Sequence, residues 1–532
     1  MASPLRGHAG LSERHDPTTG IVKTPVLSAH AVTLLVIVVV ILGAIWILLH
    51  TRLSPFSEAS VSQDLSEASD SQLSIGGYRQ TYFPAPGCIL SNLEFRHGPD
   101  HAKFITIEAL TIQGSYSGFL THHVPRVTAT GVRVFIPRFG TGASYNSTAT
   151  NTIIDELLAS DAVVEFAPEK PGTEPLRFVI HDAALKNVRS AGAIGYELRF
   201  RNPNPPGEIL VKGNFGPWPS GNPAQTPFSG AYTFDHADLS VYDGIGGTLA
   251  SLGKFDGVLQ HVNVSGNTEV PDFYVKSGGH KVRLATQFDA YVNAMNGDTF
   301  LNRVAAQLGK TNVTAEGSIA RVPGHSGKYA RLNLTAPKGR IEDLLGLFVS
   351  APRSPMSGPV AIRTRVEIPP DGDSFLQKVR LDGKFGIDEG RFTKPDTQHD
   401  VDALSAGARG ESNTNKEDPE TVMTDLSGTV AVTGGRAAFS DLSFFIPGAH
   451  ARMHGSYDLI SHRIDLHGRM RVDTRISKTT SGMKSFLLKV MDPLFKKKKT
   501  GEVVPVHILG TYEKPQFGLD IASQKDQKQA GR

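Results

Sequence analysis

The sequence lacks several features that define common classes of protein. Its single cysteine, Cys88, among 532 residues excludes an internal disulfide framework and a zinc site built from cysteines. The 54 glycines follow no collagen period, and a net charge of +3 does not indicate a nucleic-acid partner. With 39% hydrophobic and 20% charged residues, the chain is neither disordered throughout nor built of many membrane spans.

The usual signatures of catalysis are also missing. The glycine-rich stretch that begins at Asp243 lacks the lysine and the serine or threonine of a phosphate-binding loop, and no Gly-x-Ser-x-Gly segment occurs. His97 and His101, like the pair His122 and His123, have no carboxylate at a metalloprotease spacing. We therefore expect no metal, no cofactor and no enzymatic activity.

One long hydrophobic segment lies near the N-terminus. Ala31–Leu49 has 19 uncharged residues, which as a helix span about 28 Å and suit a hydrocarbon core of about 30 Å. A signal peptide is the alternative, but its hydrophobic region is shorter and ends in small residues at a cleavage site. Arg6, Arg14 and Lys23 precede the segment and predict a cytoplasmic N-terminus. The rest of the chain then lies on the outer side of the membrane.

Most of the remaining chain has the pattern of strands with one hydrophobic face. From Arg463 to Asp473, apolar residues or glycine alternate with charged residues or histidine without interruption, and residues 282–293 and 378–388 follow a similar pattern. Such strands are typical of antiparallel sheets. The sequence predicts a mainly β fold: an elongated, curled antiparallel sheet that forms a groove, with few short helices and one N-terminal transmembrane helix. About 30 strands side by side would extend roughly 140 Å.

A glycine recurs inside these strands between two apolar residues, as apolar–x–Gly–x–apolar. The alternation places this glycine on the apolar face, where it marks a bend, a bulge or the close approach of another group. Sheet curvature alone is one interpretation; the other is a trough in which the glycines make room for a bound chain. The glycines predicted to line a lipid groove are Gly213, Gly383, Gly455 and Gly468, and the motif also occurs at Gly114, Gly230, Gly257, Gly317, Gly428 and Gly510.

Three helices are expected, at 152–159, 341–348 and 483–495. The third has one continuous hydrophobic stripe and is followed by four lysines. It either caps the end of the β-structure or touches an anionic membrane surface, and residues 451–532, with 16 basic and 8 acidic side chains, have a net charge of +8. The stripe and the lysines are Met483, Phe486, Leu487, Val490, Met491, Leu494, Phe495, Lys496, Lys497, Lys498 and Lys499.

Three passages make the chain resemble the AsmA-like proteins of diderm bacterial envelopes. Leu110–Val134 is similar to their early repeat, and Phe439–Leu459 and Val503–Phe517 are similar to their C-terminal region. The resemblance implies an inner-membrane anchor and a β-groove with an apolar lining. Relatives are implicated in carrying phospholipid toward the outer membrane, and some in outer-membrane protein assembly. No catalytic residues of the family exist to transfer.

The patterns and the resemblance together divide the chain. We expect a cytoplasmic tail, a transmembrane helix, a polar linker, a β-rich groove region, an AsmA-like C-terminal region and a polar tail, at 1–30, 31–50, 51–80, 81–420, 421–522 and 523–532. Within this scheme residues 394–421 are a loop. Cys88 is expected to be a buried small residue.

The expected function is that of a single-pass inner-membrane protein with its bulk in the periplasm. It would carry or bridge phospholipid toward the outer membrane through the apolar groove, with membrane phospholipid and envelope proteins as partners. The alternative is an envelope scaffold that assists outer-membrane protein assembly by pairing with the edges of protein strands. A third hypothesis is an extracytoplasmic hydrolase with two carboxylates far apart in the sequence.

Overall fold

The structure, a computed structural model, describes part of the chain. The described residues are 40, 56–97, 102–121, 123–136, 152–167, 175–189, 192–217, 219, 222–276, 279–323, 327–349, 353–370, 374–395, 398, 401, 402, 405, 423–472, 503–511 and 514–519. The chain divides into two compact units, Met1–Ser57 and Glu58–Arg532, and the fold below is that of the second. In the described part of the chain no helix combines the length and the hydrophobicity that a membrane crossing requires.

Several sequence predictions concern residues outside the described ranges. They include the two tails, the transmembrane segment except Val40, the amphipathic helix 483–495 with its four lysines, and most of the loop 394–421. His101 and His122 also lie outside the described residues.

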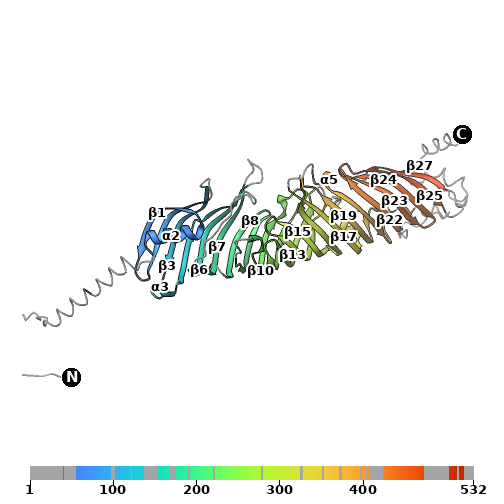
Figure 1. Cartoon of the computed structure of the whole chain (residues 1–532). Helices are drawn as coiled ribbons and strands as arrows, with labels where there is room; N and C mark the ends of the chain where they lie inside the picture. Colours follow the sequence, from blue (N-terminus) through green and yellow to red (C-terminus); the bar gives the residue numbers. More distant parts are fainter. Residues whose placement is uncertain are drawn as a thin grey trace, which may run out of the picture. The chain divides into compact units, whose positions relative to one another are not determined.

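Strands make up most of the second unit (Figure 1). The strands of the large sheet are β1 (Gln72–Thr81), β2 (Gly87–His97), β3 (Ala102–Gln113), β4 (His123–Thr130), β5 (Arg133–Ile136), β6 (Ile153–Phe166), β7 (Leu176–Val188), β8 (Ile194–Pro203), β9 (Pro206–Phe215), β10 (Phe228–Asp238), β11 (Ile245–Gly246), β12 (Thr248–Val258), β13 (His261–Val275), β14 (Val282–Asn293), β15 (Asp298–Leu308), β16 (Thr311–Arg321), β17 (Lys328–Arg340), β19 (Pro359–Ile368), β20 (Arg380–Ile387), β22 (Thr424–Thr433), β23 (Arg436–Ile446), β24 (Ala449–Asp458), β25 (Arg463–Val472), β26 (Val503–Thr511) and β27 (Lys514–Leu519). A small sheet contains β18 (Met356–Ser357) and β21 (Arg391–Phe392). The helices are α2 (Glu58–Ser69), α3 (Gly118–Thr121), α4 (Ile341–Leu345) and α5 (Phe375–Lys378), with 3-10 turns η1 (Pro223–Gln225) and η2 (Leu239–Val241).

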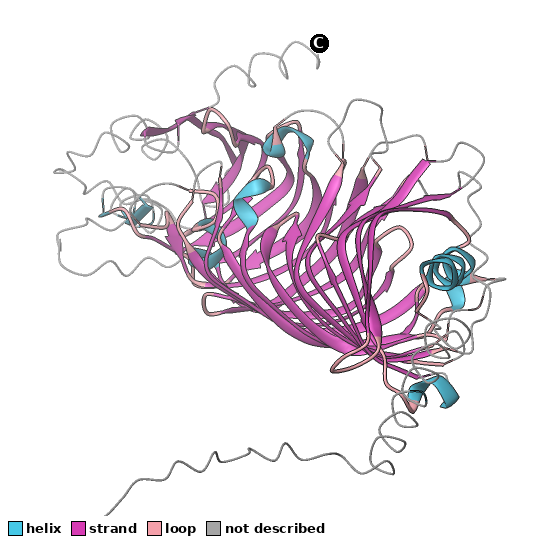
Figure 2. Cartoon of the chain, turned by 90° about the vertical axis from the view of Figure 1, so that its left-hand side faces the viewer, coloured by secondary structure: helices cyan, strands magenta, loops and turns pink. Residues whose placement is uncertain are grey.

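The large sheet is long, curled and mixed. Among the described residues it contains 25 strands, against about 30 expected for the whole chain. The strands bend in a common direction, which curls the sheet (Figure 2). Most neighbours pair antiparallel and in chain order, but β4 and β5 both pair parallel with β6. The prediction of a mainly β fold with a curled sheet and short helices is therefore confirmed, whereas the purely antiparallel arrangement is wrong.

Two further predictions of local structure are wrong. Residues 152–159, expected as a helix, belong to β6, because that strand pairs with β4 on one side and with β7 on the other. Pairing on both sides outweighs the local sequence pattern that resembled a helix start. Residues 58–80 are not a linker, since they form α2 and most of β1. In the first half of β1 every second residue is exposed. These polar positions led to the prediction of a linker, although the segment is a strand that pairs with β2.

Other local predictions are confirmed. The alternating segments 463–473 and 282–293 match β25 and β14, and α4 followed by a turn occupies the helix expected at 341–348. Cys88 in β2 is fully buried, and this burial raises the pKa of its thiol to about 12. The thiol is therefore protonated and unreactive in the folded protein.

Candidate functional site

The strand register lines up apolar residues across almost the whole sheet. Residues that pair across a ladder point to the same face. One unbroken series of paired residues crosses 22 strands from β1 to β26, and every member except Thr364 is hydrophobic, aromatic or glycine. We call this series the apolar row and its side of the sheet the row face. The row is Tyr78, Leu90, Leu110, Ala129, Ala159, Ala183, Leu198, Val211, Tyr232, Gly253, Gly266, Phe288, Val304, Ala315, Leu334, Thr364, Gly383, Val430, Phe439, Gly455, Leu466 and Ile508.

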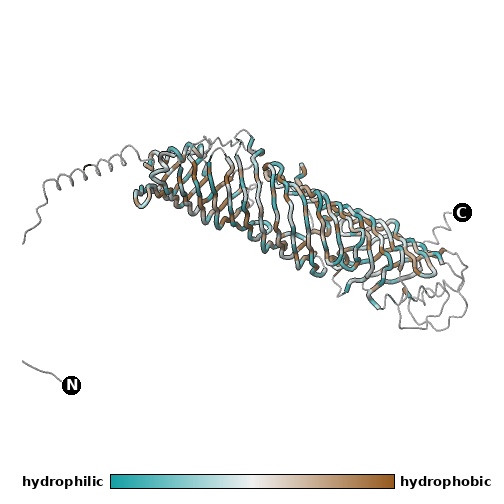
Figure 3. Tube along the Cα trace, turned by 90° about the horizontal axis from the view of Figure 1, so that it is seen from below, coloured by the Kyte–Doolittle hydropathy of each residue, from teal (hydrophilic) through white to brown (hydrophobic). Residues whose placement is uncertain are grey.

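The opposite side of the sheet, here the charged face, is lined with ion pairs. Arg199 Nε donates to Asp182 Oδ2 at 2.9 Å, and Arg177 Nε lies 2.8 Å from Glu165 Oε2. In both cases the two partners stand opposite each other on neighbouring strands. Along the strands, hydrophobic and hydrophilic residues alternate (Figure 3), which gives the sheet one dry and one wet face.

At the C-terminal part of the sheet the row face borders a cavity of about 550 Å³. This volume falls within the range of roughly 300–1,000 Å³ that is common for ligand pockets. The sheet residues of the lining come from strands between β19 and β27 and include Val360, Ile362, Leu381, Phe385, Ala451, Met453 and Leu466. Its polar members are Thr364, Lys384, Lys394, Tyr457 and His507, and the described lining contains no carboxylate. The cavity is therefore suited to a hydrocarbon rather than to a charged substrate.

Elements outside the large sheet supply the rest of the cavity lining. Ile341 and Leu345 of α4, Met356 of β18, Phe392 of β21 and Val401 all contribute. Ile341 and Val401 also join the buried hydrophobic cluster that contains Met453 and Met470. We call α4 with β18 and β21 the cover, and β19 to β26 together with the cover the covered section.

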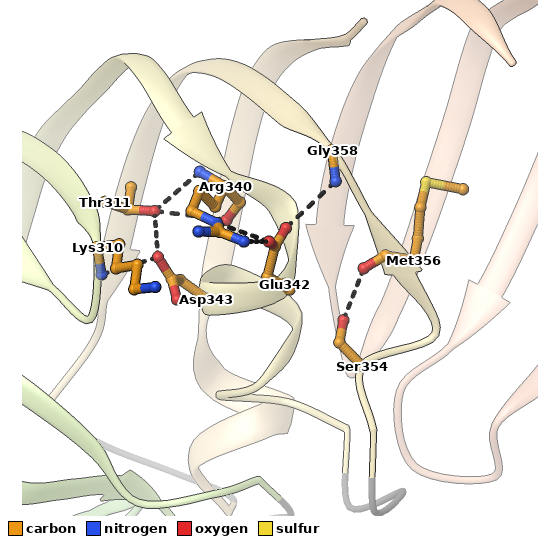
Figure 4. Close-up of polar contacts among 8 residues, drawn as sticks. All are labelled: Lys310, Thr311, Arg340, Glu342, Asp343, Ser354, Met356 and Gly358. Atoms are coloured by element: carbon orange, nitrogen blue, oxygen red, sulfur yellow. Dashed lines mark hydrogen bonds and ion pairs between the residues drawn. The ribbon is translucent and has the colours of Figure 1, made fainter. Parts of the chain in front are cut away.

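Hydrogen bonds fix the start of α4 to the sheet (Figure 4). The Thr311 hydroxyl is fully buried; it donates to Asp343 Oδ2 at 2.8 Å and accepts from the Arg340 amide at 2.9 Å. The same Asp343 oxygen accepts from the Lys310 amide at 2.9 Å. α4 is therefore bound to Lys310 and Thr311 at the start of β16, as well as to its own strand, β17.

Glu342 connects α4 to the residue that follows β18. Its carboxylate accepts from Arg340 Nε at 2.6 Å and from the Gly358 amide at 3.2 Å. Burial favours a higher pKa for Glu342, but hydrogen bonds from its own amide, from Arg340 and from Gly358 outweigh burial and lower the pKa. Ser354 Oγ donates to the Met356 carbonyl at 2.9 Å at the other end of β18. An ionised Glu342 thus helps to hold the cover in place.

In the middle of the sheet, from β8 to β14, aromatic side chains stand opposite glycines on the row face. We call this stretch the aromatic section. A Cβ atom added to Gly230 would lie 2.8 Å from Phe255 Cζ and 2.9 Å from Tyr196 Oη, so both rings extend over that glycine. The Phe228 and Phe255 rings are 4.7 Å apart, and those of Tyr196 and Phe228 are 5.8 Å apart. The paired sets are Tyr196 with Gly213, Phe255 with Gly230, Tyr232 with Gly253 and Phe288 with Gly266.

The Tyr196 hydroxyl has its own partner within this cluster. It donates to the Ser229 carbonyl at 3.1 Å, and burial raises its pKa well above the usual value. The hydroxyl therefore stays neutral, and its hydrogen bond holds the Tyr196 ring over Gly230.

The structure places the four predicted groove glycines on the row face, but in different surroundings. Gly383 lines the cavity, where an added Cβ would lie 2.6 Å from Thr364 Cβ. At Gly213, Gly455 and Gly468 an added Cβ would collide with a carbonyl oxygen of the neighbouring strand. These three glycines permit a close approach between strands. Whether the four glycines contact lipid stays a prediction.

The described histidines that were considered as metal ligands, His97 and His123, have no metal-binding arrangement. His97 ends β2, and His123 Nδ1 lies 2.9 Å from Asp155 Oδ1. Within the described ranges no group of three or more potential ligands is arranged to hold a metal ion. The helix of the cover was expected at 341–348, but residues 394–421 were expected as a loop, so the place of Val401 in the cavity lining was missed.

No family model, no curated protein and no solved structure matches this chain.

Proposed function

We propose that the protein carries or bridges phospholipid toward the outer membrane of a diderm bacterium through an apolar groove. In this proposal residues 31–50 anchor it in the inner membrane and the bulk of the chain lies in the periplasm. The observation that carries the proposal is the apolar row, which leads into the cavity of the covered section. At about 4.8 Å for each strand, the row extends roughly 100 Å along the sheet.

The physical chemistry of the row suits an acyl chain. A lipid tail requires a continuous dry surface, and it gains about 0.8 kcal/mol for each methylene group that leaves water. Ten such groups would contribute about 8 kcal/mol before the costs of ordering and association. Binding of this kind needs no specific polar group, in agreement with a lining that contains few of them.

The resemblance of residues 86–522 to AsmA-like proteins supports the location and the direction of this proposal. The resemblance supplies the envelope setting, and the apolar row supplies the physical reason for lipid binding. The absence of enzymatic activity is likewise only proposed, because a fold alone does not fix a function.

Lipid extraction and mass spectrometry on the purified full chain test the proposal. The wild-type protein is expected to carry phospholipid in a fixed ratio. The variant Leu381→Lys places a charge at a half-buried residue of the cavity lining, so bound lipid should fall at least tenfold. A wild-type protein that is free of lipid would overturn the proposal.

The variant Leu252→Lys is the matched control. Leu252 lies in β12 on the charged face with 58% of its surface exposed, so the same substitution should leave the lipid content unchanged. Equal loss of lipid in both variants would show that the lipid is held by nonspecific contacts rather than by the cavity.

A second candidate function is a scaffold for outer-membrane protein assembly. It is favoured by the ends of the sheet, since among the described strands β27 pairs only with β26 and β1 only with β2. Unpaired edges can accept a strand from another protein. A purified chain that carries a bound envelope protein and no lipid would favour this scaffold over the carrier.

A further inference from the structure

The ion pairs of the charged face are not distributed evenly along the sheet. In β6 to β9 the residues that stand opposite each other have opposite charges, as in Glu165 with Arg177 and in Glu197 with Lys212. In β24 and β25 the pattern changes, because Arg452 stands directly opposite Arg469. Like charges at such positions destabilise a sheet. The pair therefore has a cost in the isolated protein that a binding partner could offset.

Among the described residues, no acid stands beside this arginine pair in the register of the sheet. The next residues along the same register are Ser443 in β23 and Pro505 in β26. Both arginines are exposed, and neither forms an ion pair with a described residue.

Two described acids of β23 and β25, Asp441 and Asp465, are engaged with other groups. The Thr429 amide donates to Asp441 Oδ1 at 2.7 Å, and this contact is the main reason that the pKa of Asp441 is lowered. Asp465 Oδ1 lies 3.0 Å from His467 Nε2. The two guanidinium groups are thus left to solvent on an open sheet surface.

We propose that the charged face of β24 and β25 binds the surface of a membrane that contains anionic phospholipids. Arginine suits this role because its planar guanidinium group forms paired hydrogen bonds with phosphate oxygens. An open sheet surface can approach a flat layer of head groups, whereas it offers no pocket for a single anion. The net charge of +8 over residues 451–532 attracts the same surface. This contact is separate from the proposed lipid track, which lies on the row face.

Binding to vesicles tests the inference with the full chain. The protein is purified in phosphatidylcholine nanodiscs, and its affinity is measured for immobilised vesicles of phosphatidylcholine alone and of equimolar phosphatidylcholine and phosphatidylglycerol. The wild type should prefer the anionic vesicles. The double variant Arg452→Gln/Arg469→Gln should lose about 30-fold in that affinity, which corresponds to about 1 kcal/mol for each arginine near an anionic surface.

The double variant Arg199→Gln/Lys212→Gln controls for net charge. It removes two cations from the same face, but each of these stands opposite an acid, Asp182 or Glu197. It should bind the anionic vesicles within a factor of three of the wild type, and a loss equal to that of the arginine variant would overturn the inference. Equal wild-type affinity for both kinds of vesicle would also overturn it. Tighter binding to polyglutamate than to anionic vesicles would replace the membrane with an acidic protein as the partner.

The lipid content of the cavity separates this inference from the proposed function. Both double variants should retain the phospholipid of the wild type, because none of the four residues belongs to the described cavity lining. Loss of vesicle binding with retained lipid supports the surface contact. Loss of both properties in the arginine variant would mean that the fold was damaged and that the contact is not independent, which overturns the inference.

Discussion

The covered section and the aromatic section have the same alternating strand pattern, but they differ in what lies against their row faces. In the covered section, mostly aliphatic side chains and α4 surround a cavity of about 550 Å³. In the aromatic section, rings such as Tyr196 and Phe255 extend across glycines and pack against each other. Alternation thus specifies a dry face, and the size of the side chains on it decides whether that face packs against itself or leaves space for a ligand.

The largest difference between the sections should appear when a side chain is truncated to alanine. Phe255→Ala removes a ring that is 9% exposed and is expected to cost about 3–5 kcal/mol in the free energy of local unfolding. Leu466→Ala removes a half-buried side chain that already borders the cavity, so its cost should be near 2 kcal/mol. Hydrogen exchange of the amides in β12 and β25 measures both values. Equal costs would mean that the two sections are packed alike.

A smaller effect is expected when a methyl group is added to a glycine. Gly230→Ala places a Cβ within 3 Å of the Lys212 carbonyl oxygen and of the Phe255 and Tyr196 rings, so we expect a loss of about 1–3 kcal/mol from overpacking. Gly386→Ala is the control, since no atom lies within 4 Å of the added Cβ and its stability should change by less than about 1 kcal/mol. Hydrogen exchange of β10 and β20 reports both changes, and a stable Gly230→Ala protein would show that β9 and the two rings can move aside.

The smallest effect concerns the cover of the covered section. Glu342→Gln removes the charge that accepts from Arg340 and Gly358, and should destabilise α4 by about 1–2 kcal/mol. The pKa of Glu342 is lowered in the folded protein, so its stabilising contribution is complete above the unfolded value of about 4.3. The contribution is lost as the pH falls through the folded pKa. Exchange of the α4 amides between pH 7 and pH 3 should show this loss in the wild type but not in the variant.

Strands were predicted well where alternation was strong. Val282–Asn293 and Arg463–Val472 were recognised because their two faces differ sharply in polarity. The segment at 152–159 was misjudged because its strand character depends on β4 and β7, which are distant in sequence. Periodicity identifies the face of a residue, whereas pairing partners depend on contacts that a single strand does not encode.

The site was predicted less completely for a related reason. The glycine motif located the apolar face correctly, and Gly383 lies on the cavity. The motif did not indicate that Gly213, Gly455 and Gly468 allow close approach of the adjacent strand, because this contact depends on register. The helix at 341–348 was expected, but the sequence did not indicate that it faces the cavity, because Ile341 and Val401 meet only after the intervening strands have folded.

The pairing of strands largely in chain order has a consequence for how such a protein changes its length. A hairpin inserted between two strands meets the same kind of neighbour that was there before, and it adds about 10 Å to the sheet. The dry face continues through the insertion as long as the new strands alternate in the same way. The length of the dry face can therefore be changed by the number of hairpins, with no new fold required.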